Sequence, residues 1–203
     1  MLQLHNVEQR SEEWYTLRKK YPLTASNAQA IGNNGKGLET FVWEALADRK
    51  SFAARENYTN KDLDRGVELE SQARSIYELE TGNKVAEVGF VTNDEISRVG
   101  GASPDGLIGE DGLIEIKCFN DIKHFRYAVE GLEPESQYLW QMQMQMLITE
   151  RKWCDFVAYN PNFKKSLLII RITADADMQE KIKEGLKTGE KMINELEKKY
   201  EKI

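Results

Sequence analysis

The alternation of helical and strand patterns along the chain predicts an α+β protein in which a central mixed sheet is flanked by helices. Three observations support this fold class: a helical period of apolar residues before Gly82, a period of about two between residues 84 and 118, and a final succession of helix, two strands and helix. The 203 residues contain no internal repeat and no linker, so we expect a single domain over residues 1–203, with a helix over residues 175–202 as an extension.

Helices dominate the chain before Gly82. Ser11 can cap the first of them because its hydroxyl can accept a backbone N–H, and the two glutamates that follow suit the positive end of a helix. A second helix start lies at Thr24, before a glycine-rich loop over residues 32–37. The predicted helices cover residues 11–20, 38–49 and 61–81, and the last of them has an apolar stripe formed by Leu63, Val67, Ala73 and Tyr77.

Beyond Gly82 the alternation of apolar and polar residues indicates strands. The expected strands cover residues 84–92, 97–102, 113–118, 153–159 and 166–173. The first three follow one another closely, so we expect an antiparallel meander, and the last two flank an Asn-Pro-Asn turn. The expected helices of this half cover residues 122–129, 135–149 and 175–202.

The composition excludes several classes of protein. A formal charge of −6 argues against a protein that binds nucleic acid nonspecifically over its whole surface, but it is compatible with a local basic groove. Two cysteines, Cys118 and Cys154, are too few for a disulfide framework or for a four-cysteine zinc or iron–sulfur site, so we expect buried free thiols. No apolar run reaches the roughly 18 residues of a membrane span, and Met1 to Arg10 lack a signal-peptide pattern. We therefore expect a cytoplasmic protein without a membrane partner.

Glu70 is out of place on its helix. At about 100° per residue, its side chain falls within about 20° of Leu63 and Tyr77, inside the apolar stripe. A carboxylate there needs a partner. On this helix alone, a structural explanation, either an irregular stripe or a buried salt bridge with Arg74, would account for Glu70 as well as a functional role would.

Two further carboxylates lie on a turn and on a strand. Alternation along residues 113–118 sends Glu115 and Lys117 to the same face, so both charges share one site. Asp105 lies in a turn between Pro104, which fixes its own φ, and a glycine, so the turn can hold the carboxylate rigidly. Taken singly, the strand pair would be an ordinary solvated ion pair and the aspartate a plain turn residue.

Together these residues form a specific pattern: a helix glutamate, an aspartate after a proline and, ten residues later, Glu-x-Lys on a strand. Oxygen ligands of this kind suit Mg²⁺ or Mn²⁺, and a lysine beside the metal can hold or deprotonate the attacking water. The arrangement resembles the PD-(D/E)XK nuclease superfamily, which implies a restriction-endonuclease-like core. The signature would be Pro104-Asp105 and Glu115-Ile116-Lys117, with Glu70 as the helix carboxylate.

The resemblance narrows to the lambda-type phage exonuclease family, the YqaJ-like viral recombinases, from Gln9 to about Pro161. Each matching segment is weak alone, but all of them in order and at compatible spacings form a strong signal. The departures are one extra residue between Arg18 and Thr24 and a terminal helix rich in Lys and Glu. The matching segments are Gln9-Arg10-Ser11-Glu12-Glu13-Trp14, Leu17-Arg18, Thr24-Ala25-Ser26, Gly66 to Glu70, Ser103-Pro104-Asp105-Gly106, Glu115-Ile116-Lys117 and Tyr138-Leu139-Trp140-Gln141-Met142-Gln143.

The resemblance implies a pocket for a DNA 5′-phosphate formed by Arg18, Ser26, Ser103 and Gln141, since guanidinium forks and hydroxyls suit a terminal phosphate. Without the family match, Arg18 would be explained as favourable charge at a helix end. Most other glutamines of the helix that carries Gln141 are expected to be polar surface. The resemblance also implies that Leu63, a core residue by periodicity, is a hydrophobic wedge that helps to part the duplex.

The resemblance implies a single nuclease domain that acts as a metal-dependent 5′-to-3′ exonuclease on double-stranded DNA and leaves 3′ single-stranded overhangs for recombination. Glu70, Asp105, Glu115 and the backbone carbonyl of Ile116 would hold one or two Mg²⁺ or Mn²⁺ ions, and Lys117 would orient the nucleophile. It further implies a homo-oligomer, a ring-shaped trimer around DNA, a single-strand annealing protein as partner, and the host-cell cytoplasm if the chain is phage-encoded. A PD-(D/E)XK endonuclease and a DNA-end-binding module that does not cut remain alternatives.

Overall fold

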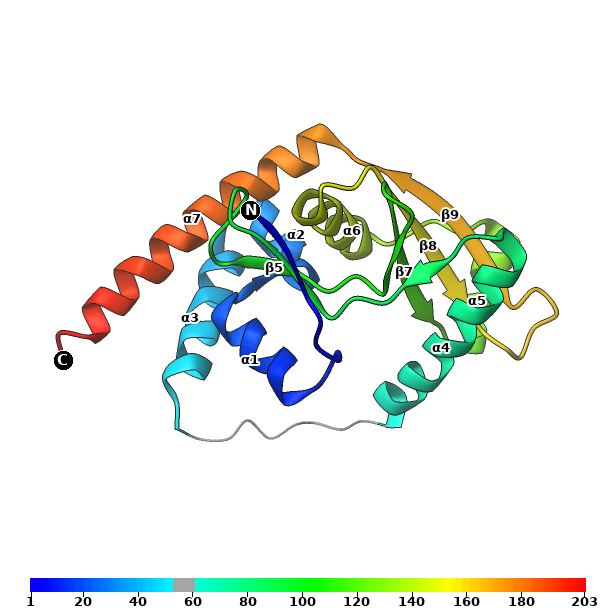
Figure 1. Cartoon of the computed structure of the whole chain (residues 1–203), viewed down its shortest axis with the longest axis horizontal. Coiled ribbons are helices and arrows are strands. Elements are labelled where there is room, and N and C mark those ends of the chain that lie inside the picture. The colour runs from blue at the N-terminus through cyan, green and yellow to red at the C-terminus, as the bar shows by residue number, and fades with distance from the viewer. Residues whose placement is uncertain (53–60) are drawn as a thin grey trace.

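The computed structural model describes residues 1–52 and 61–203 (Figure 1). In the helix over residues 61–81, it describes the side chains from Glu68 onward. Each predicted helix is present. The helices are α1 (Glu12–Lys20), the short 3₁₀ helix η1 (Ala25–Asn27), α2 (Ala28–Asn33), α3 (Lys36–Lys50), α4 (Lys61–Thr81), α5 (Asp121–Glu130), α6 (Ser136–Thr149) and α7 (Ala176–Tyr200). The strands are β1 (Leu2–His5), β2 (Leu23–Thr24), β3 (Val85–Ala86), β4 (Phe90–Asn93), β5 (Gly100–Ala102), β6 (Gly106–Ile108), β7 (Gly112–Cys118), β8 (Trp153–Tyr159) and β9 (Leu167–Thr173).

Local chemistry explains where two of the helices begin and end. Ser11 caps α1, because its hydroxyl accepts the backbone N–H of Trp14 at 3.2 Å. α4 is followed by Gly82, whose φ of 73° lies in the left-handed region that side chains disfavour. The N–H of Gly82 still bonds to the carbonyl of Glu78 at 2.9 Å, which completes the last turn.

A five-stranded mixed sheet, in the order β3-β6-β7-β8-β9, carries the candidate site. β7 pairs in parallel with β8, from Gly112 opposite Trp153 to Cys118 opposite Tyr159. β6 pairs antiparallel with β7, and β9 pairs antiparallel with β8. The parallel pair needs a long crossover, which α5 and α6 provide. This confirms the mixed sheet flanked by helices that the sequence predicts.

The predicted antiparallel meander is wrong. Residues 84–92 contain parts of two strands that belong to different sheets, β3 and β4, and of residues 97–102 only β5 is extended. β4 and β5 pair in a second sheet of order β1-β4-β5-β2, whereas the antiparallel partner of β7 is β6. Gly89 marks the break: a Cβ there would lie 1.9 Å from the backbone oxygen of Val7, so another segment of chain passes where a longer strand would continue.

Helices cover both faces of the mixed sheet. α4 packs on one face through Ala73 and Tyr77, which contact alternate residues of β7 and β8 such as Ile114. α6 packs on the opposite face, where Met142 lies in a cluster with Phe156. Figure 1 shows α6 between this sheet and the group formed by α2, α3 and α7. The central helix α6 therefore contacts both halves of the protein.

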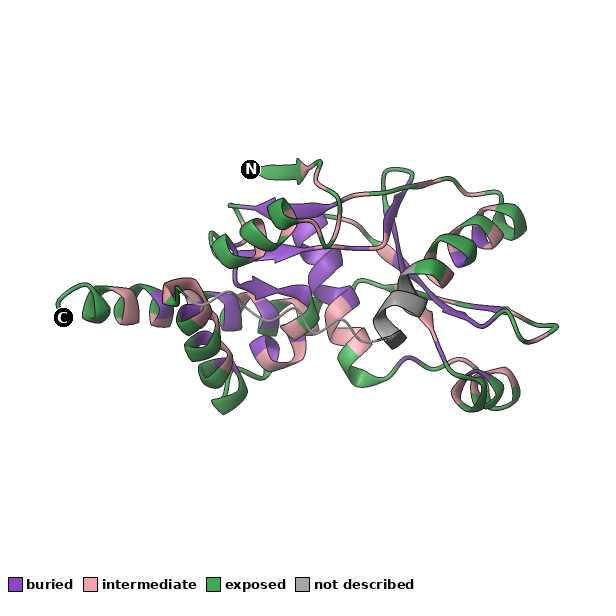
Figure 2. Ribbon diagram, turned by 90° about the horizontal axis from the view of Figure 1, so that it is seen from below, coloured by how far each residue is buried: buried purple, intermediate pink, exposed green. Residues whose placement is uncertain are grey.

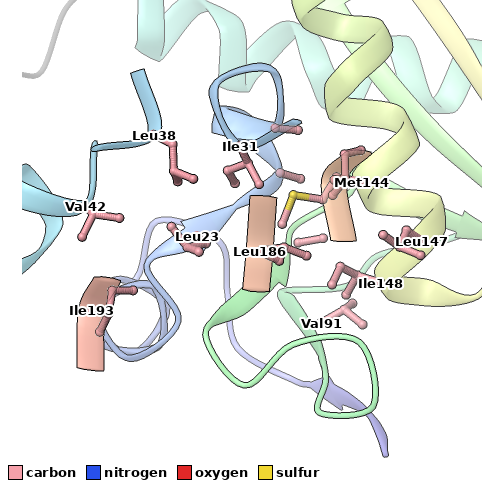
Figure 3. Packing of buried hydrophobic residues seen from close by; sticks show 14 of the residues in the cluster. Leu23, Ile31, Leu38, Val42, Val91, Met144, Leu147, Ile148, Leu186 and Ile193 are labelled. Carbon is pink, nitrogen blue, oxygen red and sulfur yellow. The ribbon is translucent and has the colours of Figure 1, made fainter. Parts of the chain in front are cut away.

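A second apolar core joins α2, α3, α6 and α7 (Figure 3). Leu186 of α7 is fully buried in a cluster that also contains Leu23, Ile31 and Met144. The approach of α7 to α2 is close, because a Cβ on Gly185 would lie 1.9 Å from the backbone oxygen of Ile31. The terminal helix is thus packed into the core along much of its length.

Figure 2 shows buried residues along the strands and on the inward helix faces, with the far end of α7 exposed. Among residues 1–52 and 61–203, no helix combines the length and the apolar character needed to cross a membrane. Cys154 is buried and Cys118 is half-buried, and neither forms a disulfide bond within the part of the chain that the structure describes. Burial raises the pKa of the Cys154 thiol well above its usual range, so it stays protonated at neutral pH.

Candidate active site

β7 presents Glu115 and Lys117 on the face that α6 covers. The carboxylate of Glu115 is only 1% exposed, and its Oε1 lies 2.5 Å from the ammonium of Lys117. Gln141 Nε2 also donates to Oε1, and Gln145 Nε2 donates to Oε2, each at 2.7 Å. The two glutamines are one turn apart on α6 and therefore face the same strand. A buried carboxylate requires such donors, and here each oxygen has at least one.

The turn before β6 holds Asp105 against β7. Asp105 Oδ2 accepts the backbone N–H of Ile116 at 2.6 Å. Burial raises the pKa of Asp105 well above its usual value, and the nearby carboxylate of Glu115 raises it further, while Lys117 lowers it. The carboxyl groups of Asp105 and Glu115 are therefore close enough for their negative charges to oppose each other.

α4 brings Glu70 to the same region. Its Oε1 lies 3.3 Å from Nη2 of Arg74, and its Oε2 lies 3.8 Å from Nη2 of Arg10. Burial raises the pKa of Glu70, the two arginines lower it, and Glu115 raises it. The salt bridge with Arg74 that the sequence left open is present, and the same carboxyl group is also within electrostatic range of Glu115.

Lys117 is a charged hydrogen-bond donor in this arrangement. Burial lowers the pKa of its ammonium, but the neighbouring carboxylates of Glu115 and Asp105 raise the pKa more, so it ends above its ordinary value. An ammonium has three donors and no lone pair. At neutral pH, Lys117 can therefore orient an oxygen atom but cannot take a proton from it.

The donor chemistry of Glu70, Asp105 and Glu115 fits a hard divalent cation. Their carboxyl groups come from three separate elements, and burial, with a smaller contribution from the charge of Glu115, raises the pKa of both Glu70 and Asp105. Within the described ranges, no three or more His, Cys, Asp or Glu side chains already converge in ligand geometry. Both oxygens of Glu115 already accept from side-chain donors, so a metal held by Glu115 would replace at least one of these contacts.

A cavity of about 420 Å³ gives access to two of these carboxyl groups, since both Glu70 and Asp105 line it. Arg10 lies at its wall with a φ of 70°, a left-handed conformation that is strained for an arginine. Gln9 fixes the neighbouring backbone by donating to the carbonyl oxygens of Val88 and Pro104 at 2.9 and 3.1 Å. The sequence placed Arg10 in a family segment but assigned it no role.

Arg18 and Ser26 are in direct contact. Nη2 of Arg18 donates to the hydroxyls of Thr24 and Ser26 at 3.1 and 3.2 Å, and its guanidinium lies 4.5 Å from the ring centre of Trp14. Trp14 Nε1 in turn donates to Ser103 Oγ at 2.8 Å. Burial lowers the pKa of Arg18 from a high value, and the group stays charged at neutral pH. The roles of Trp14 and Thr24 were not foreseen, although both lie in family segments.

Gln141 donates to Glu115, and in the part of the chain that the structure describes no hydrogen bond joins its side chain to Arg18, Ser26 or Ser103. Leu63 belongs to the α4 backbone, but its side chain lies outside the described residues. The expected surface position of the other glutamines on this helix is wrong for two of them, because Gln143 is 2% exposed and Gln145 is 0% exposed. The spacing of four residues between Gln141 and Gln145 was the available signal for their shared face.

The mixed sheet with helices on both faces, and its Pro-Asp turn beside a Glu-x-Lys strand, place the chain in the class of PD-(D/E)XK-type nucleases. The chain belongs to the YqaJ-like viral recombinase family, whose domain matches residues 13–152.

Solved structures agree with this family. An alkaline exonuclease from Laribacter hongkongensis is 34% identical, with a TM-score of 0.78 over 95% of this chain and 99% of that one. The structure of the same exonuclease in complex with dAMP gives a TM-score of 0.79 at 34% identity, again over 95% and 99% of the two chains. A phage-related exonuclease from Haemophilus somnus 129PT, 17% identical, has a TM-score of 0.64 over 88% and 96%, which is a likeness of fold. No curated protein sequence gives a significant match.

Proposed function

We propose that the protein is a metal-dependent 5′-to-3′ exonuclease that degrades double-stranded DNA and leaves 3′ single-stranded overhangs for phage-type recombination. The observation that carries the proposal is that Asp105 binds the backbone of β7 beside the Glu115–Lys117 ion pair and lines one cavity with Glu70, in a member of this family. The similar alkaline exonuclease from Laribacter hongkongensis supports the reaction class.

Glu70, Asp105, Glu115 and the backbone carbonyl of Ile116 would hold one or two Mg²⁺ or Mn²⁺ ions. When bound, such an ion polarises a phosphate and makes a water more acidic. Lys117 orients the attacking oxygen with its N–H groups, since its raised pKa keeps it charged at neutral pH. Gln141, on α6, donates to the carboxylate of Glu115 and helps to hold it.

Arg18, Ser26, Ser103 and Gln141 would bind the 5′-phosphate of the strand that is degraded. Arg18 and Ser26 support this role by direct contact, and Trp14 links Arg18 to Ser103. A charged fork beside hydroxyl groups suits a terminal phosphate. The pocket would determine which DNA end is attacked, and Leu63 would part the duplex as a wedge.

We further propose a ring-shaped trimer through which DNA is threaded, and a single-strand annealing protein as its partner. The formal charge of −6 is a reason for such topology, because Coulomb attraction to DNA is weak for the chain as a whole. A closed ring would keep the substrate bound between successive cuts.

Incubation with linear and closed circular duplex, with and without Mg²⁺, tests the proposed reaction. We expect loss of the linear form alone, and only with Mg²⁺. Loss of both forms would instead indicate a PD-(D/E)XK endonuclease. Retention of both, with binding to DNA ends, would indicate a module that does not cut. Ca²⁺ should support DNA binding but little cleavage, because its coordination is longer and looser than that of Mg²⁺.

A further inference from the structure

Gln145 is a buried polar residue whose position core packing alone does not explain. It is 0% exposed on α6, and its Nε2 donates to Glu115 Oε2 at 2.7 Å. Its own Oε1 has no hydrogen-bond partner among the described residues. An unpaired buried oxygen opposes folding, whereas a methionine, like its neighbours Met144 and Met146, would fill the same volume without this penalty.

The contacts of Glu115 divide into two groups. Oε1 meets Lys117 and Gln141, which are both partly exposed and lie on the side of the site that solvent can reach. Within the part of the chain that the structure describes, only Gln145 donates a side-chain hydrogen bond to Oε2, and it does so from the core. The amide of Gln145 therefore restricts rotation of the Glu115 carboxylate, and it does so from a buried position that DNA cannot reach.

We propose that Gln145 is a positioning residue that fixes the carboxylate of Glu115 for metal binding. This inference rests on the proposed metal-dependent function of the same site. Outer partners that hydrogen-bond to a metal-ligating carboxylate orient it, and their loss typically weakens metal affinity about 10- to 100-fold. Among the described residues, the side chain of Gln145 hydrogen-bonds only to Glu115, and at 0% exposure it is out of reach of DNA.

Titration of the folded protein with Mn²⁺ in a calorimeter, without DNA, tests this role. We expect Gln145→Met, which conserves volume, to raise the Mn²⁺ dissociation constant by about 10- to 100-fold. In Mg²⁺, kcat on linear duplex should fall and the Mg²⁺ concentration for half-maximal rate should rise, while KM for DNA stays unchanged. Gln145→Asn keeps the amide but is one methylene shorter, so it should also weaken Mn²⁺ binding. It is the second test variant if Gln145→Met does not fold.

Gln143→Met is the matched control. Gln143 is also buried on α6, but its Nε2 donates to the carbonyl of Thr173 at 2.9 Å and its Oε1 accepts the N–H of Asp175 at 2.8 Å, away from Glu115. This variant should lower the melting temperature and leave Mn²⁺ affinity unchanged. A purely structural role for Gln145 would give the same result in its own variants, and that result would overturn the inference.

The wild-type titration distinguishes a failure of the proposed metal-dependent function from a failure of the role of Gln145. Wild-type protein that binds Mn²⁺ and degrades DNA, together with folded Gln145 variants of equal Mn²⁺ affinity, would refute only the role of Gln145. Wild-type protein that binds no Mn²⁺ would refute both the proposed metal-dependent function and this inference.

Discussion

Asp105 and Lys117 contribute charge to the proposed site rather than volume to the core, since Asp105 lies on a turn and Lys117 is 27% exposed. We expect Asp105→Ala and Lys117→Ala each to lower hydrolysis of linear duplex in Mg²⁺ by more than about tenfold, with the far-UV circular dichroism unchanged. Glu110→Ala, an exposed acid on the turn between β6 and β7, is the control and should keep its activity. Either site variant retaining wild-type turnover would contradict the assigned roles.

The raised pKa values of Asp105 and Glu70 predict how stability without metal depends on pH. Burial raises both, so the native state binds these protons more tightly than the unfolded state does. Their contribution to stability is fully present below the ordinary carboxyl pKa and is lost as pH rises through the raised values. Asp105→Asn removes the contribution of Asp105 to this pH dependence. Without metal, the melting temperature of the variant minus that of the wild type should therefore increase from pH 5 to pH 8.

Without metal, the wild type should lose stability as the pH rises. Mg²⁺ should oppose this loss, because the cation binds the ionised carboxylates. The increase in melting temperature on adding Mg²⁺ should therefore be larger at pH 8 than at pH 5, where protons compete with the metal. Scanning calorimetry at both pH values measures the two effects. A constant difference between wild type and Asp105→Asn across this range would show that the Asp105 pKa is not raised.

Arg18 provides the test of 5′-end recognition. If it binds the terminal phosphate, duplex with a 5′-phosphate should be degraded faster than duplex with a 5′-hydroxyl, and Arg18→Ala should reduce this ratio. A charge-assisted hydrogen bond to an anion corresponds to about tenfold to over a hundredfold in affinity. Initial rates at subsaturating DNA, for both proteins on both ends, give the ratio.

Lys19→Ala is the control for the Arg18 test, because Lys19 is a neighbouring cation on α1 that pairs with Asp48 at 3.8 Å. It should change the rates on both kinds of end equally. Equal losses for Arg18→Ala on the two ends would identify Arg18 as a structural or general backbone contact. The phosphate pocket would then have to be abandoned even if the metal site were correct.

At the scale of elements, the packing of α7 on α2 depends on the absence of a side chain at Gly185. Replacing glycine by alanine within a helix normally stabilises it by about 1 kcal/mol. At Gly185 the added Cβ would lie 1.9 Å from the backbone oxygen of Ile31, so the helices must separate. We expect Gly185→Ala to destabilise the protein by about 1–3 kcal/mol in urea unfolding.

Gly37→Ala is the control for Gly185→Ala, because Gly37 also lies in a helix, α3, but has room for a side chain. The added Cβ would lie 3.5 Å from the Cβ of Ala30, an ordinary contact, so this variant should be neutral or slightly more stable. If Gly185→Ala were equally stable, the close approach of α7 to α2 would not be a required feature of the core.

At the scale of the whole molecule, the proposed ring makes two measurable predictions. Light scattering should give a mass three times the 23.4 kDa of one chain. A single binding event should degrade many nucleotides even when excess unlabelled DNA is added as a trap, because a closed ring cannot release the duplex sideways. A monomeric mass under assay conditions would contradict the trimer without affecting the assignment of the metal site.

Helices were predicted well because their signals are local. Caps such as Ser11, breaks such as Gly82 and the apolar stripe of α4 depend on residues within a few turns of one another. The strands β1, β2 and β6 were not predicted, because each is short and is defined by its pairing rather than by its own pattern. The predicted meander failed for the same reason, since β3 and β4 pair with different partners.

The sequence by itself determined the helices, the mixed α and β class, and the acidic and basic residue types of the candidate site, because spacing along a turn or strand fixes which side chains share a face. Only the tertiary structure decided that β4 and β5 form a separate sheet, that Gln141 and Gln145 both hold Glu115, and that α7 is packed into the core. These arrangements depend on contacts between segments far apart in the chain. Their energy comes from burying two faces against each other, and neither face specifies its partner alone.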